Sequence, residues 1–331
     1  MGSRRTSGRR WAAWAAIAAV LAGCAIGYLY LSPFSKPIGH GPAGPAVPRE
    51  AFQGPWSDRR ILALGVGDSV TAGYGASTGH SYFDRIISNP PDEWPDLAGA
   101  CLQKVLPNLS ALNVSVSGST SDQHLEDQID PFPVQEPDVF GIVFMTTGGN
   151  DIIHNYGRTP PREFAMYGAT PQQTEPWVAA FETRLDTMLT RLRGKFPGGC
   201  HIFLLNIYDP TDGIGDPQNA GLPPWKDGLA LIDAYNAVIS RCAAKYSYVH
   251  LVDMHAAFLG HGIHCTQPWL PQYHRDDPHY WYYDNLEDPN DRGYDAIRRI
   301  LLLEVIRIKP ELESGSPSGN GAAALQHALS S

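Results

Sequence analysis

Cysteine is scarce in this sequence of 331 residues, and no two of its five cysteines have the Cys-x-x-Cys spacing. This argues against a zinc ribbon or a dithiol redox motif. Apart from Cys24, the cysteines lie in the body of the chain, and their even number would allow one or two disulfides in an oxidising compartment. Buried, reduced thiols are the alternative for these residues, which are Cys101, Cys200, Cys242 and Cys265.

Positive charge is also scarce beyond the N-terminus. The formal net charge is −9, and all 34 acidic residues follow residue 36, whereas five of the 25 basic residues precede residue 37. An acidic body without a basic stripe argues against nucleic acid as the main partner. The 43% of hydrophobic and 10% of aromatic residues are enough for a sizeable core, so wholesale disorder is excluded.

The N-terminus is typical of an export or anchoring segment. Four arginines precede Trp11–Leu31, an uncharged run long enough to span a bilayer, and they would hold the N-terminus in the cytoplasm. Leu21-Ala22-Gly23-Cys24 is similar to a bacterial lipoprotein signal, in which Cys24 would be lipidated. A cleaved signal peptide is the third interpretation. All three predict an extracytoplasmic domain, either periplasmic or at the cell surface.

Composition divides the chain into four parts. We expect a membrane anchor or signal segment at 1–31, a linker rich in Pro and Gly at 32–58, one folded domain at 59–310, and a disordered tail of mostly Ser, Gly and Ala at 311–331. The folded part has about 250 residues, a size that a single α/β domain can fill.

Strand and helix patterns alternate along the folded part. Short apolar runs predict strands at 61–67, 111–117, 139–146, 201–207 and 248–254. Helical spacing predicts helices at 96–106, 176–196, 229–246 and 291–308. This alternation predicts an α/β fold with a mostly parallel, five-stranded sheet and helices on both faces. In such folds, ligands bind at the carboxyl ends of the strands.

Small-residue motifs follow three of the predicted strands. Ser69, in Gly67-Asp68-Ser69, can present its hydroxyl as a nucleophile from a turn. Gly118, after the second strand, lets its backbone N–H approach a ligand. Asn150, in Gly148-Gly149-Asn150-Asp151, can donate its side-chain amide to an oxyanion. Together the three motifs indicate acyl-transfer chemistry at one edge of the sheet.

These three blocks resemble those of the GDSL, or SGNH, hydrolases, a superfamily of esterases, lipases, thioesterases and carbohydrate esterases. The resemblance spans residues 61–299 and implies a flavodoxin-like, three-layer α/β/α sandwich. It implies that Ser69 is the nucleophile, and that the backbone N–H groups of Ser69 and Gly118 form the oxyanion hole together with Asn150. We expect no cofactor. We also expect no metal, because the acidic turn Asp209–Asp216 lacks the spacing of a calcium loop.

The fourth block departs from the family. The family pattern reads Asp-x-x-His-Pro-Asn before the last helix, but here Asn285 and Asp288 stand at the Asp and His positions, ahead of Pro289-Asn290. A serine nucleophile needs a base, and a carboxylate of ordinary pKa is a poor base at neutral pH.

Three explanations remain open. The first takes the base from the long segment Met254–Tyr283, where His279 has the Asp-x-x-His spacing and Asp276 or Asp288 would orient its ring. The second makes Asp288 itself the base, with its pKa raised by burial. The third is loss of hydrolysis, which would leave a ligand-binding protein. Other candidate bases are His274, His264 and His154.

We therefore expect a membrane-anchored, extracytoplasmic serine esterase, whose partners are the membrane and an ester of a small molecule, lipid or glycan. The alternatives are an O-acyltransferase or deacetylase acting on envelope polysaccharide and a non-catalytic binding protein. The aromatic segment Trp269–Tyr283 fits either a lid or a sugar-stacking platform, or it packs the loop in place. Loops, rather than motifs, set specificity in such folds.

Overall fold

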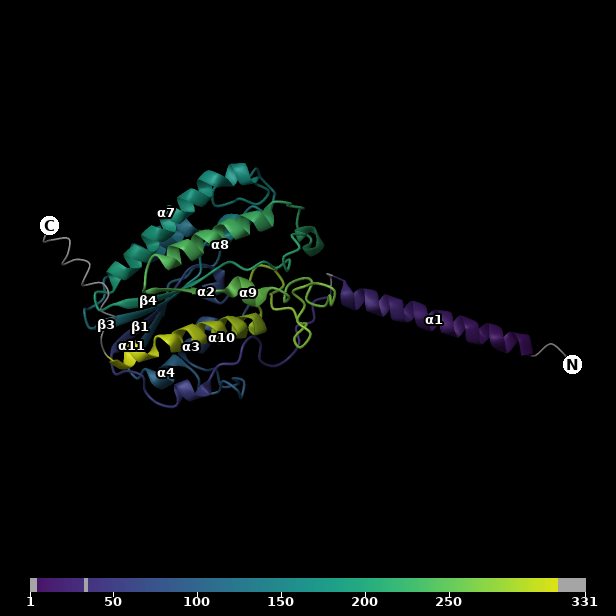
Figure 1. Ribbon diagram of the computed structural model, residues 1–331, viewed down its shortest axis with the longest axis horizontal. Helices are drawn as coiled ribbons and strands as arrows, with labels where there is room; N and C mark the ends of the chain where they lie inside the picture. The colour runs from purple at the N-terminus through teal and green to yellow at the C-terminus, as the bar shows by residue number, and fades with distance from the viewer. Residues whose placement is uncertain (1–4, 33–34, 315–331) are drawn as a thin grey trace.

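The computed structural model describes residues 5–32 and 35–314. At its centre is a parallel, five-stranded sheet with the order β2-β1-β3-β4-β5 (Figure 1). This order is the flavodoxin-like one, in which the chain reverses its direction of progress between β1 and β3. The predicted fold class is confirmed. The strands are β1 (Arg60–Val66), β2 (Leu109–Asn113), β3 (Val139–Met145), β4 (Cys200–Leu205) and β5 (Val249–Val252).

Helices cover both faces of the sheet (Figure 1). One layer contains α7 (Pro171–Lys195) and α8 (Gly228–Ala244), and the other contains α3 (Tyr82–Ile87), α4 (Leu102–Val105), α10 (Asp291–Arg307) and α11 (Lys309–Ser314). Alternate side chains of β3 enter different cores, because successive residues of a strand point to opposite faces. Phe140 and Ile142 pack with the α10 side, whereas Val143 and Met145 pack with α7 and α8.

The remaining helices are short, apart from the first. They are α1 (Arg5–Leu31), η1 (Arg49–Phe52), α2 (Ser69–Ala72), α5 (Ser121–Gln123), η2 (His124–Ile129), α6 (Gly149–Ile153), η3 (Pro217–Ala220) and α9 (Met254–Phe258). The helix predicted at 96–106 is reduced to α4, since Gly99 has a φ of 83° that ends any helix from 96. The sequence reading also missed α3, which begins where the Ser81 side chain accepts a hydrogen bond from Asp84 N.

Helix α1 extends away from the rest of the molecule (Figure 1). Its segment Trp11–Leu31 has the length and composition to cross a membrane, and its side chains are not buried against the protein. An apolar helix so near the N-terminus is typical of either a signal sequence or an anchor.

Residues 35–47, which we call the N-terminal strap, pack along α10 without forming a helix or strand. The backbone N–H of Ala43 donates to Asp295 at 3.0 Å, and Arg292 donates to the carbonyls of His40 and Gly41. Prolines explain why the strap lacks regular structure, because they have no N–H to donate. Composition says nothing of how tightly such a segment packs.

The C-terminal part and the cysteines can be placed as well. The predicted tail at 311–331 begins inside α11, and residues 315–331 lie outside the described residues.

Within the described ranges no disulfide is formed, and the four cysteines of the body are all buried. Burial raises the pKa of the Cys200 and Cys265 thiols to about 12, which keeps them protonated and unreactive.

Candidate active site

Ser69 is the first residue of α2, at the carboxyl end of β1. The preceding Asp68 caps this helix, because its Oδ1 accepts hydrogen bonds from Val70 N at 3.1 Å and from Thr146 Oγ1 at 2.8 Å. Gly67 has a φ of 135°, and a Cβ at this position would collide with the carbonyl oxygen of Thr146. Only glycine therefore lets the chain turn so close to β3, and that turn presents Ser69 at the edge of the sheet.

Burial raises the pKa of Asp68 to about 6, although the hydrogen bonds from Thr146 and Val70 oppose the shift. The backbone of the preceding residue, Gly67, is also fixed by hydrogen bonds. Gln128, from η2, accepts from Gly67 N at 2.8 Å and donates to Gly67 O at 2.9 Å. Thr146 and Gln128 are positioning residues that no sequence motif had indicated.

Asn150 lies in the first turn of α6, directly after β3. Its Nδ2 donates to the carbonyl of Ser119 at 2.9 Å, and a side-chain amide has a second hydrogen to offer. Ser119 Oγ in turn donates to Gly67 O at 3.1 Å. Gly118 precedes Ser119 and is exposed, with a φ of 82°. Ser119 therefore joins the three predicted motifs at one place.

Asp288 is the residue whose carboxyl faces Ser69. It is only 2% exposed, and Asn285 Nδ2 donates to its Oδ2 at 2.6 Å. Its Oδ1 has no hydrogen bond of ordinary geometry within the described residues, yet the Ser69 side chain lies near enough to the carboxyl to lower its pKa as a hydrogen-bond donor. Burial raises the pKa of Asp288 above its ordinary value, and the hydrogen bonds from Ser69 and Asn285 only partly offset this rise.

A tight loop aims the Asp288 side chain at the site. Tyr282 and Pro289 form an antiparallel bridge, and Asn285 Oδ1 accepts from the backbone N–H groups of Glu287 and Asp288. Leu286 has a φ of 68°, in the left-handed region that a branched side chain rarely occupies. Such a conformation persists only where its surroundings enforce it, and here it lies two residues before Asp288.

His279 is placed differently. Its Nδ1 lies 2.5 Å from Asp277 Oδ1, and its ring packs on Gly39, where a Cβ would come within 2.6 Å of it. Within 5–32 and 35–314 the structure shows no contact between His279 and Ser69, and no histidine lines the pocket beside Ser69. The other candidate histidines are engaged elsewhere or half-buried; His264 bonds Asp216, His274 bonds the Leu259 carbonyl, and His154 ends α6.

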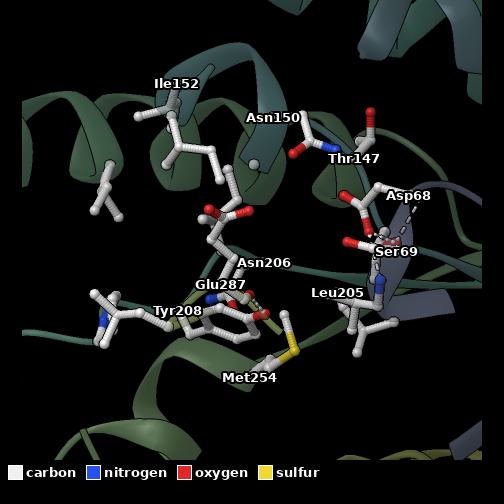
Figure 2. A pocket seen from close by; sticks show the side chains of 18 of the residues that line it. Asp68, Ser69, Thr147, Asn150, Ile152, Leu205, Asn206, Tyr208, Met254 and Glu287 are labelled. Atoms are coloured by element: carbon white, nitrogen blue, oxygen red, sulfur yellow. Dashed lines mark hydrogen bonds between the residues drawn. The ribbon is translucent and has the colours of Figure 1, made fainter. Parts of the chain in front are cut away.

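A pocket of about 110 Å³ opens beside Ser69. Figure 2 shows Asp68, Ser69 and Asn150 gathered at one side of this pocket. Most of the other lining side chains are aliphatic or aromatic, including Ile152, Ile153, Leu205, Ile207, Tyr208, Leu222, Ile232, Met254 and Leu286. The pocket can therefore hold an apolar group with its polar end at the serine.

Glu287 and Tyr156 form a polar contact on the wall of the same pocket. Their side chains are hydrogen-bonded to each other, and Tyr208 Oη donates to the Glu287 backbone carbonyl. Burial raises the pKa of the Glu287 carboxyl above its ordinary value. Neither residue had been singled out from the sequence, because the contact joins two loops that are far apart in the chain.

The chain matches one protein-family model and several solved structures. Residues 66–296 match the family model of the GDSL-like lipase/acylhydrolases. Among solved structures, the chain is similar to phospholipase A1 from Streptomyces albidoflavus NA297, with 22% identity and a TM-score of 0.41 over 75% of this chain and 99% of that one. It is similar to an extracellular lipase from Streptomyces rimosus, with 14% identity, a TM-score of 0.43 and coverage of 76% and 99%. No curated protein matches the sequence.

Proposed function

Because the chain belongs to the GDSL-like lipase/acylhydrolase family and is therefore a hydrolase of ester bonds, we propose that Ser69 is its nucleophile and Asp288 its base. The observation that carries this proposal is the buried carboxyl of Asp288 within hydrogen-bonding reach of the Ser69 side chain. Asp288 also occupies the position that corresponds to the histidine of the family's fourth block.

In the proposed reaction, the Ser69 hydroxyl gives its proton to the Asp288 carboxylate as Oγ attacks the ester carbonyl carbon. The resulting oxyanion accepts hydrogen bonds from the N–H groups of Ser69 and Gly118 and from Asn150 Nδ2. The intermediate then collapses, and the leaving alkoxide takes the proton from Asp288. Water repeats the sequence on the acyl-enzyme, with Asp288 again accepting and returning one proton.

Burial supports a carboxylate in this role. A base works best when its pKa lies near the working pH, and burial moves the pKa of Asp288 upward in that direction. His279 as the base remains a prediction, and it would require the segment Met254–Tyr283 to change its position. The aliphatic lining of the pocket supports an ester whose acyl group is apolar.

The proposal also includes the location of the enzyme. The arginines ahead of Trp11–Leu31 and the unbroken course of α1 through Leu31 support an uncleaved anchor with the domain outside the cytoplasm. Lipidation at Cys24 stays an alternative way to hold the same domain at the membrane.

The test is hydrolysis of p-nitrophenyl butyrate by wild type, Ser69→Ala, Asp288→Asn and His279→Ala. We expect the first two variants to lose about a thousandfold or more in kcat, because each removes a group that takes part in the chemistry. His279→Ala should stay within about twofold of wild type. An inactive His279→Ala beside an active Asp288→Asn would overturn the assignment of the base.

A further inference from the structure

A short piece of chain ties the domain to α1. Helix α1 ends at Leu31, and the strap is already bound to the domain at Pro37, whose carbonyl accepts a hydrogen bond from Tyr280 N at 2.8 Å. The Lys36 ammonium lies 5.0 Å from the centroid of the Tyr280 ring. At about 3.5 Å per residue, the chain from Leu31 to Pro37 spans at most about 20 Å. A membrane-spanning α1 would therefore hold Tyr280 close to the bilayer surface.

Tyr280 belongs to the same end of the molecule as the active site. It lies in the segment between β5 and α10, which also carries Asp288, and Figure 1 shows these loops at the end of the sheet from which α1 departs. Ser69 and Asn150 follow the carboxyl ends of β1 and β3 at this same edge. The point of attachment and the pocket thus lie at one pole of the domain.

This pole carries exposed apolar side chains, which we call the apolar rim. Trp269 is 62% exposed, and Tyr74 packs its ring against Tyr283 with their centroids 6.0 Å apart. Gly213, beside Ile214, lies against Gln272 of the Trp269 loop. The rim consists of Ile38, Tyr74, Ile214, Trp269 and Tyr283. Each lies on the strap or on a loop that follows the carboxyl end of a strand.

We propose that the apolar rim rests on the bilayer that holds α1, so that the pocket opens toward the membrane and receives a lipid ester from it. This inference rests on the anchor and the esterase proposed above. Tryptophan and tyrosine side chains favour the interface between lipid and water, which is where the short tether would hold them. The exposed acidic residues Asp276 and Asp284 are balanced by Arg275 and Lys36, so the described residues of this pole carry no excess of positive charge to favour an anionic surface over a zwitterionic one.

The first test places the rim relative to the lipid. The full chain, with Cys24→Ser and either Trp269→Cys or Val134→Cys, is labelled with the fluorophore NBD and inserted into phosphatidylcholine vesicles. The remaining cysteines are buried and do not compete for the label. Val134 is the matched control, because it is 63% exposed but precedes the amino end of β3, at the opposite pole.

We expect the label at 269 to shift to the blue and to be quenched by nitroxide lipids, while the label at 134 is quenched by aqueous iodide. A label at 269 that iodide quenches as strongly as the label at 134 would overturn the inference, even with the anchor in place. Release of the chain from the vesicles by an alkaline wash would show that α1 is not an anchor, and the inference that the rim rests on the bilayer would then lose its basis.

The second test uses two substrates with the same leaving group. Trp269→Ser in the full chain should slow hydrolysis of umbelliferyl palmitate dissolved in the vesicles by about tenfold, and leave hydrolysis of aqueous umbelliferyl acetate unchanged. Val134→Ser should change neither rate. Equal loss on both substrates would overturn the rim's role. A wild-type chain inactive on the acetate would contradict the esterase instead, while the label positions would still report on the rim.

Discussion

Asp288 gives the proposed reaction a characteristic dependence on pH. Because a base must be ionised to accept a proton, kcat should fall as pH drops through the raised pKa of Asp288. In Asp288→His the acidic limb should move to about pH 6.5, the ordinary pKa of histidine. The measurement is the pH profile of kcat for both proteins. Superimposable profiles would show that another group is the base.

Asn150 is the second residue with a specific expected effect. Asn150→Ala removes one of the proposed oxyanion donors, so kcat should fall by about a hundredfold or more with little change in KM. The substitution also removes the hydrogen bond to the Ser119 carbonyl, which should lower the free energy of unfolding by about 1 kcal/mol. Steady-state kinetics and urea unfolding of the same preparation separate the two effects. A change in KM alone would contradict the oxyanion role.

Asp68 makes stability depend on pH. Its pKa rises from 3.8 in the unfolded chain to about 6 in the fold, so the folded state binds more protons between these values and loses stability as pH rises through them. Asp68→Asn keeps an oxygen acceptor and never ionises. The difference in unfolding free energy, that of Asp68→Asn minus that of wild type, should therefore increase between pH 4 and pH 6 by up to about 3 kcal/mol. Parallel stability curves would show that folding does not raise the pKa of Asp68.

At the scale of elements, Asn290 connects α10 to the loop that carries Asp288. Its Oδ1 caps α10 by accepting from Arg292 N and Gly293 N, and its Nδ2 donates to the carbonyls of Tyr280 and Tyr282. Asn290→Ala should lower the free energy of unfolding by about 2 kcal/mol or more.

Asn290→Ser serves as the matched comparison, because its hydroxyl oxygen can cap α10 while the hydrogen bonds donated to Tyr280 and Tyr282 are lost. It should lie between wild type and Asn290→Ala in urea unfolding and in esterase activity. Equal losses in the two variants would show that the cap contributes nothing.

The same elements show how far the sequence leads. Gly67-Asp68-Ser69 and Gly148-Gly149-Asn150 could be placed together in advance, because parallel strands bring their carboxyl ends to one edge. The orientation of Asp288 could not, since it depends on a left-handed Leu286 and on Asn285 bonding back to its own loop. Likewise no periodicity marks the packed strap, which is held through its backbone by Asp295 and Arg292.

At the scale of the whole molecule, the strap should be part of the folded unit. A chain that begins at residue 48 loses the hydrogen bonds that the strap makes to Asp295 and Arg292, both of which are buried. Each lost hydrogen bond of this kind weakens the fold by about 1 kcal/mol, so the melting temperature should fall by about 6 °C or more relative to a chain that begins at residue 35. Calorimetry of the two chains is the measurement. Equal melting temperatures would make residues 35–47 a linker.

The pairing of the strap with α10 also sets an order of events in the cell. The strap leaves the ribosome well before α10, because β1 to β5 and the helices between them lie between the two segments in the chain. Contacts between distant parts of a chain form only after both have emerged. Asp288 immediately precedes α10, so its carboxyl can reach Ser69 only after all five strands of the sheet have emerged. On the proposal that Asp288 is the base, a chain that has emerged only as far as β5 would carry Ser69 without that base, and esterase activity would begin only after the loop ahead of α10 has folded.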